Sequence, residues 1–180
     1  MGPSTGTVLV NQSYARSPNT VLLAFFLALT CSRAMADQPN LREQLIGTWT
    51  YHSVDIVRPD GSREPLFGAN PQGMASFDAT DHYILMTSRA DLPRFAAKGR
   101  MNGTAEENLA VVHGSIAHFG RYTVNEAQKT ITFHIETSTF PNWNGLDQTR
   151  PVTIVGDQLT WKTPASTGGG TAEVVLRRLR

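Results

Sequence analysis

Two hydrophobic patterns divide the chain. Residues 21–31 form a continuous apolar run of 11 residues, whereas downstream of it short runs rich in Val, Ile, Thr, Tyr and Phe alternate with turn residues. Within 129–137, Ile131, Phe133 and Ile135 share one face, because successive side chains of a strand point to opposite faces. We predict eight such strands: 45–57, 73–77, 82–88, 121–125, 129–137, 148–155, 158–163 and 171–178.

Short turns separate most of these runs. In Arg58-Pro59-Asp60-Gly61 the proline presets φ for a turn and the glycine accepts a positive φ. Strands joined by turns this short pair as hairpins, so we expect an antiparallel sheet.

One helix is predicted between the strands. Thr104 and Glu107 have the spacing of a capping box, which satisfies free backbone N–H groups at a helix start. Four apolar residues then recur at helical spacing: Leu109, Val112, Ile116 and Phe119. Gly120 is expected to end the helix. One helix cannot cover both faces of so large a sheet, so we predict a mainly β fold: a single antiparallel up-and-down barrel of about eight strands with one inserted helix.

The apolar run near the N-terminus is too short to span a bilayer, which takes about 20 residues. Arg16 precedes it, and Ala34-Met35-Ala36 places small residues after it. That order is typical of a secretory signal peptide, with cleavage after Ala36. The alternative is a buried core helix, which would leave a long polar arm in front of it.

This interpretation divides the chain into a signal peptide, residues 1–36, and a barrel domain, residues 37–180. The mature protein is then expected in the periplasm or secreted, with no integral membrane span. A lipid anchor at Cys31 is disfavoured, because Thr30 stands where lipoprotein signals usually have Gly, Ala or Ser.

Composition agrees with one core-forming domain. The 180 residues are 40% apolar and 17% charged, with Lys+Arg 16 against Asp+Glu 15. Cleavage would remove Arg16 and Arg33 but no acidic residue, so the mature chain has 16 − 2 = 14 basic groups and a net charge of −1. That balance argues against a nucleic-acid partner. Because Cys31 is the single cysteine, no internal disulfide or cysteine-rich zinc site can form.

No motif indicates a catalytic centre, a metal or a cofactor. The five histidines form no His-x-His or His-Glu-x-x-His pair, and no Gly-x-Ser-x-Gly elbow occurs. On a helix, His113 and His118 would be about 140° apart, which prevents joint metal coordination. We therefore expect no catalytic residue, no metal and no cofactor.

Two arginines are candidates for holding an anionic head group at the barrel mouth. Strand alternation places Arg150 on the side of Val152 and Ile154. It places Arg89 on the side of Leu85, or outside if Ile84 points inward. The simpler interpretation is that each aliphatic stem covers apolar surface while the guanidinium reaches water.

Two aromatic segments are further candidates. Residues 140–145 form a turn-rich loop in which Phe140 and Trp143 either bind a flat ligand or pack against the barrel end. In the basic stretch 89–100, Phe95 suggests that the segment folds over the opening rather than forming only a solvated face.

Several motifs together resemble the lipocalin-like domain family. The first strand begins with Gly47-Thr48-Trp49, a Gly-x-Trp signature of lipocalins and their calycin relatives. The more specific motifs are Arg58-Pro59-Asp60-Gly61, Arg89-Ala90-Asp91-Leu92-Pro93-Arg94-Phe95, Gly120-Arg121-Tyr122 and Phe140-Pro141-Asn142-Trp143-Asn144-Gly145. The resemblance covers residues 43–178 and implies a small barrel with an internal cavity that carries apolar small molecules in many relatives.

The resemblance also implies a structural role for the Gly-x-Trp signature. In lipocalins the tryptophan lies across the closed end of the barrel under a basic residue of the last strand. Here Gly47 and Trp49 would form that signature, and Arg177 is our first choice for the basic residue, with Arg178 as the alternative. The chain departs from typical lipocalins in its mid-chain helix and in lacking their disulfide.

Two function classes remain open at this stage. The leading hypothesis is a binding protein rather than an enzyme, holding a small apolar, amphipathic or acidic-headed ligand in the barrel. The alternative is a cofactor-independent isomerase, cyclase or hydrolase in the same cavity. In it, Arg150 or Arg89 would stabilise negative charge and His134 or Glu136 would move protons.

Overall fold

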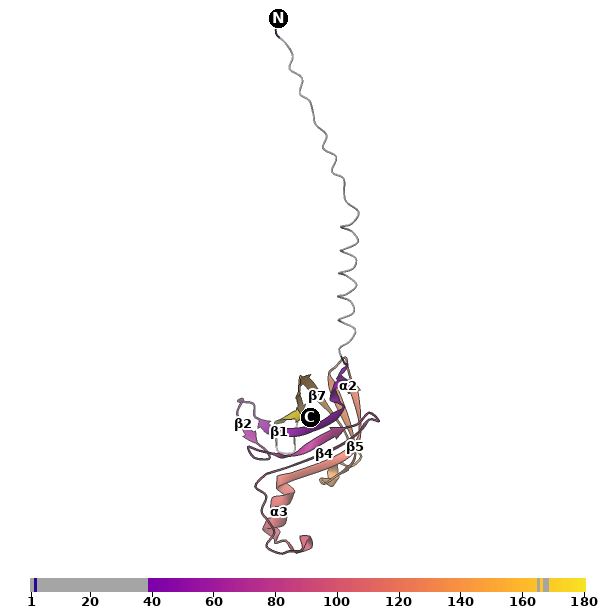
Figure 1. The fold of residues 1–180 in the computed structure, drawn as a ribbon. Coiled ribbons are helices and arrows are strands. Elements are labelled where there is room, and N and C mark those ends of the chain that lie inside the picture. Colours follow the sequence, from indigo (N-terminus) through magenta and orange to yellow (C-terminus); the bar gives the residue numbers. More distant parts are fainter. Residues whose placement is uncertain (1, 3–38, 165, 167–168) are drawn as a thin grey trace. The chain divides into compact units, whose positions relative to one another are not determined.

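Eight antiparallel strands pair in chain order and close into a barrel, because β1 pairs with β9 as well as with β3 (Figure 1). This computed structural model describes residues 2, 39–164, 166 and 169–180, so the predicted signal peptide and Cys31 lie outside the described residues apart from Gly2. The barrel strands are β1 (Gly47–Val57), β3 (Gln72–Phe77), β4 (His82–Ser88), β5 (Ser115–Asn125), β6 (Thr130–Ser138), β7 (Asp147–Val155), β8 (Gln158–Thr163) and β9 (Thr171–Arg178). The predicted fold class is confirmed.

Four short elements join or flank these strands. Strand β2 (Arg63–Pro65) pairs with the end of β1, and helix α2 (Leu41–Leu45) precedes β1. The 3-10 turns are η1 (Arg100–Asn102) and η2 (Pro141–Trp143). The sequence analysis missed β2 and α2 because each is too short to show a periodic pattern; Leu45 belongs to α2 rather than to the first strand.

The predicted inserted helix exists but is shorter than expected. Helix α3 (Ala105–Gly114) has the predicted capping box: Thr104 Oγ1 accepts from the Glu107 backbone N–H at 3.2 Å, and Glu107 accepts from the Thr104 N–H at 2.9 Å. Figure 1 shows α3 outside the barrel wall. The helix ends at Gly114, and the chain continues directly into β5.

The extension of that helix to Gly120 was wrong. Ile116 and Phe119 belong to β5, which pairs with β4 and β6 along its length. His118, Gly120 and Tyr122 are buried in alternation, and this period-2 pattern competes with the helical spacing of the apolar residues. Gly120 serves close packing instead of helix termination, because a Cβ there would lie 2.1 Å from the His134 carbonyl oxygen.

The closed end of the barrel is built around Trp49. Its indole is fully buried and donates through Nε1 to the Leu45 carbonyl at 2.9 Å. The Arg178 guanidinium lies over the ring, 4.1 Å from its centroid, and Nη1 donates to the Ile46 carbonyl at 3.0 Å. A second guanidinium nitrogen donates to the Gln44 carbonyl, so Arg178 also satisfies the free carbonyls at the end of α2.

Arg177 is therefore not the residue that covers Trp49. Ala172, Val174 and Leu176 point into the barrel, so alternation brings Arg178 to the inner side and leaves Arg177 exposed. Gly47 does belong to this cluster: its φ is +131°, and an added Cβ would lie 2.9 Å from Arg178 Nη1.

We predict that Arg178→Ala lowers the free energy of unfolding by roughly 2–3 kcal/mol, because it removes a cation–π contact and charged hydrogen bonds to backbone carbonyls. Urea unfolding followed by circular dichroism measures the change. Arg177→Ala is the matched control and should stay within about 0.5 kcal/mol of the parent protein. Equal losses in the two variants would contradict this account of the closed end.

Candidate functional site: a cavity inside the barrel

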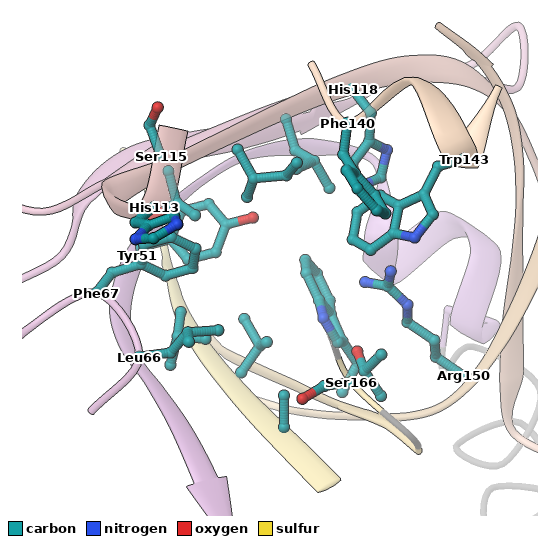
Figure 2. Close-up of a pocket in the computed structure, with 18 of the residues that line it drawn as sticks. Tyr51, Leu66, Phe67, His113, Ser115, His118, Phe140, Trp143, Arg150 and Ser166 are labelled. Atoms are coloured by element: carbon teal, nitrogen blue, oxygen red, sulfur yellow. The ribbon is translucent and has the colours of Figure 1, made fainter. Parts of the chain in front are cut away.

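A cavity of about 600 Å³ lies inside the barrel (Figure 2), and Trp49 is not among the described residues that line it. Its wall combines inward-facing side chains of strands β1, β4, β5, β7, β8 and β9 with the last turn of α3 and with η2. Most of this wall is apolar or aromatic, including Tyr51, Phe67, Leu85, Trp143 and Trp161. A hollow of this size and lining suits a small organic molecule.

Arg150 is the charged group of this wall. Strand β7 turns its side chain inward, where it is only 5% exposed, and Figure 2 shows the guanidinium reaching the cavity beside Trp143. The guanidinium carbon lies 4.8 Å from the ring centroid of Phe133 and 6.0 Å from that of Trp161. Burial lowers the pKa of Arg150 to about 10, so the group stays charged at neutral pH.

The hydrogen bonding of Arg150 is incomplete. Nη2 donates to Gln148 Oε1 on the same strand, whereas Nε has no partner among the residues the structure describes. Within that same part of the chain, Arg150 forms no ion pair with a carboxylate, whereas the half-buried Arg178 at the closed end lies 3.9 Å from Asp157. A buried cation without a counterion is costly, so this wall is suited to receiving a negative charge.

His118 and Tyr83 form a buried pair behind Trp143. The Tyr83 hydroxyl lies 2.7 Å from His118 Nδ1, and the His118 ring meets Trp143 edge-on with centroids 5.6 Å apart. Burial, with a smaller contribution from the Arg150 charge, lowers the pKa of His118 to about 3, and burial also raises the pKa of Tyr83. Both groups are therefore neutral at physiological pH.

The hydrogen bond couples the tautomer of His118 to the hydroxyl of Tyr83. If Tyr83 donates to Nδ1, the imidazole hydrogen resides on Nε2, whereas if Nδ1–H donates to the hydroxyl, Nε2 is an acceptor. The sequence analysis missed His118 as a wall residue because it assigned this position to a helix. Alternation of His118, Gly120 and Tyr122 was the signal that could have found it.

The other polar groups of the wall are hydroxyls, the indole N–H groups and the exposed imidazole of His113. Thr87 Oγ1 and Trp161 Nε1 are buried without a hydrogen-bond partner in the described part of the molecule. Burial raises the pKa of Tyr51, so its hydroxyl stays protonated. Among the described residues that line the cavity, none is an aspartate or a glutamate.

Three of the five predicted ligand-binding residues come together at this cavity. Phe140, Trp143 and Arg150 all line it, and the rings of Phe140 and Trp143 meet edge-on with centroids 5.7 Å apart. Trp143 also packs against the buried core. The two interpretations of this loop are therefore compatible: its aromatic rings pack together and present a face to the cavity.

The other two predicted ligand-binding residues, Arg89 and Phe95, do not line the cavity. Tyr83, Leu85 and Thr87 point inward, as the alternative with Arg89 on the side of Leu85 required. However, β4 ends at Ser88, before Arg89. Arg89 instead forms a bidentate ion pair with Asp91 at 2.8 Å in solvent.

Phe95 packs beside Gly103, ahead of α3, where an added Cβ would lie 2.6 Å from its ring. The segment is tied to α3 by a hydrogen bond from the Ala96 N–H to Glu107. The expected fold of this segment over the cavity opening is therefore not seen.

The proton-transfer roles considered for His134 and Glu136 are wrong. Phe133 and Ile135 occupy the inner face of β6, which turns His134 and Glu136 to the outside. His134 Nδ1 binds Asp147 at 2.8 Å on the outer surface. Neither side chain reaches the cavity.

Among the described residues, no group of three or more His, Cys, Asp or Glu side chains is arranged to hold a metal ion. Over the same residues, we find no helix with the length and apolar character needed to cross a membrane.

We predict that His118 makes the protein sensitive to acid. In the unfolded chain this imidazole titrates near its ordinary pKa of 6.5, whereas in the folded protein its pKa is about 3. As pH falls below 6.5, only the unfolded state gains the proton, and stability declines until the folded pKa is reached. Between pH 7 and pH 5 the parent protein should lose about 2 kcal/mol more unfolding free energy than His118→Gln.

Urea unfolding at the two pH values measures this difference. Glutamine keeps a hydrogen-bonding group beside Tyr83, and His52→Gln, at an exposed position of β1, is the control. Undiminished acid sensitivity in His118→Gln would show that another group is responsible.

The chain is similar to a known protein family, to a curated protein and to solved structures. The lipocalin-like domain family matches residues 46–177. A curated relative, the 4'-hydroxy-3'-methoxypropiophenone carrier protein ppsC of Aspergillus oryzae, is 32% identical over 81 residues, which are 42% of this chain and 73% of that protein. A crystal structure of a lipocalin-like protein from Bacteroides uniformis aligns with a TM-score of 0.42 at 14% identity, over 75% of this chain and 98% of that one. The chain belongs to the lipocalin-like domain family.

Proposed function

We propose that this protein is an exported carrier that holds a small apolar or acidic-headed molecule inside the barrel. The observation that carries the proposal is the cavity of about 600 Å³, walled by aromatic and aliphatic side chains. Pockets for small molecules commonly measure about 300–1,000 Å³ and combine an apolar wall with a few polar groups. The wall described above has this composition.

The curated relative supports a carrier rather than a catalyst. Its name states that it carries 4'-hydroxy-3'-methoxypropiophenone, a substituted phenyl ketone. The rings of Phe140, Trp143 and Trp161 offer flat surfaces on which an aromatic ligand of this kind could pack.

An enzyme working in the same cavity is the weaker alternative. Isomerase, cyclase or hydrolase chemistry without a cofactor requires a group that accepts a proton near neutral pH. Two histidines line the cavity. His118 is buried, and its pKa of about 3 makes it a poor acceptor, whereas His113 is exposed on the last turn of α3. We therefore favour binding without chemistry.

We predict saturable binding of the apolar fluorophore N-phenyl-1-naphthylamine, whose emission rises when it leaves water. Ala172→Phe should weaken this binding by roughly 10-fold or more, because the added ring occupies the cavity that Ala172 lines. Fluorescence titration and native mass spectrometry measure the binding.

Val155→Phe is the matched control, because Val155 is exposed at the outer end of β7. It should bind like the parent protein. Absence of binding in the parent protein, or equal binding in the Ala172→Phe and Val155→Phe variants, would argue against a carrier that uses this cavity.

We also propose that the protein is exported to the periplasm or secreted after cleavage following Ala36. The support is the order of charge, apolar run and small residues in 1–36. Expression of the full chain in a bacterium with a general secretory pathway should yield exported protein that begins at Asp37. Intact-mass analysis tests this, and a cytoplasmic product that retains residues 1–36 would overturn it.

A further inference from the structure

We propose that the ligand is an organic anion with a flat apolar body, and that Arg150 pairs with its acidic group. This inference rests on the proposed carrier function and identifies the class of molecule carried. The site then requires an acidic head, whereas the proposed function allows either an apolar or an acidic-headed molecule.

The first argument is the unbalanced charge of Arg150. Arg150 is buried, yet the one side-chain hydrogen-bond partner of its guanidinium in the described structure is the neutral amide of Gln148. The aromatic faces of Phe133 and Trp161 offset part of the desolvation cost but supply no negative charge. A ligand anion would supply the missing counterion by accepting from the guanidinium where Arg150 lines the cavity.

The second argument is the donor character of the polar wall. The guanidinium of Arg150 can only donate, and the imidazole of His118 is neutral. The Tyr51 hydroxyl stays protonated and can donate as well. Because the described wall holds a guanidinium and no carboxylate, the site favours a ligand that accepts hydrogen bonds.

The third argument is the position of Arg150 between two hollows. A smaller hollow of about 280 Å³ shares Trp143, Arg150, Thr163 and Ser166 with the main cavity. Its wall is more polar, with Gln148 and Thr149 among its residues. An acidic group bound to Arg150 would therefore lie at a polar boundary while the apolar body occupies the main cavity.

The aromatic rings set the shape of that body. Phe140 and Trp143 lie above the Arg150 guanidinium in Figure 2, and the guanidinium is held by Gln148 from its own strand. A flat ring attached to the acidic group would contact these side chains while the acid meets the guanidinium. Neutral apolar molecules would fill the cavity but leave Arg150 without a counterion.

The test compares 2-naphthoate with its neutral methyl ester, which has the same ring system. Isothermal titration calorimetry gives each affinity directly, and displacement of N-phenyl-1-naphthylamine reports whether each compound enters the cavity. We expect the parent protein to bind 2-naphthoate roughly 10- to 100-fold more tightly than the ester, the range for hydrogen bonds to a charged group.

Arg150→Met should abolish that preference by weakening 2-naphthoate alone, because methionine keeps an apolar stem of similar length without the charge. Arg150→Lys keeps the charge but loses bidentate hydrogen bonding to a carboxylate, so the preference of this variant for 2-naphthoate over the ester should be intermediate. Arg121→Met removes an exposed arginine from the outer face of β5 and should leave both affinities unchanged. Thermal unfolding verifies that each variant is folded.

The outcomes separate this inference from the proposed function. If the parent protein binds the acid and the ester equally, or Arg150→Met keeps the preference for the acid, the anionic ligand is excluded while the carrier function stands. If neither compound nor N-phenyl-1-naphthylamine binds, the carrier function itself fails. Should Arg150→Met not fold, the comparison of acid with ester in the parent protein and in Arg150→Lys still decides.

Discussion

Closure of the sheet between β1 and β9 is the constraint on which the rest of the structure depends. Once the first and last strands pair, every strand must send alternate side chains into one enclosed space. Large rings fill this space at one end, where Trp49 is covered by Arg178. Toward the other end the inward side chains do not meet, and the cavity is what remains. The site is thus a consequence of how far the side chains fill the barrel.

Closure also explains why so polar a residue as Arg150 is buried. Its neighbours Val152 and Gln148 lie on the same inward parity of β7, so strand register alone turns the guanidinium inside. A register shift of one residue would turn Arg150 outward, but it would also turn the apolar side chains of the strand outward. The charge is therefore held in place by the same pairing that builds the core.

Most of the fold could be predicted from the sequence, because alternation marks each long strand and short turns join them. The predicted helix was too long for a specific reason. Leu109, Val112 and Ile116 fit a helical spacing, whereas the pairing of β5 with β4 and β6 depends on contacts between residues distant in the chain. Among site residues, parity predicted Arg150 but not Arg89, since parity has no meaning once β4 has ended. His118 was hidden by the wrong element. Arg178 was predictable in principle from the inward run of Ala172, Val174 and Leu176, which shares its parity.

The three tryptophans are divided between the two ends of this barrel. Trp143 and Trp161 face the cavity, whereas Trp49 is enclosed under Arg178. A molecule entering the cavity changes the surroundings of the first two indoles and leaves the third as it was. The protein therefore contains its own optical reference: the emission of Trp49 provides a constant background against which cavity occupancy can be read without any attached label.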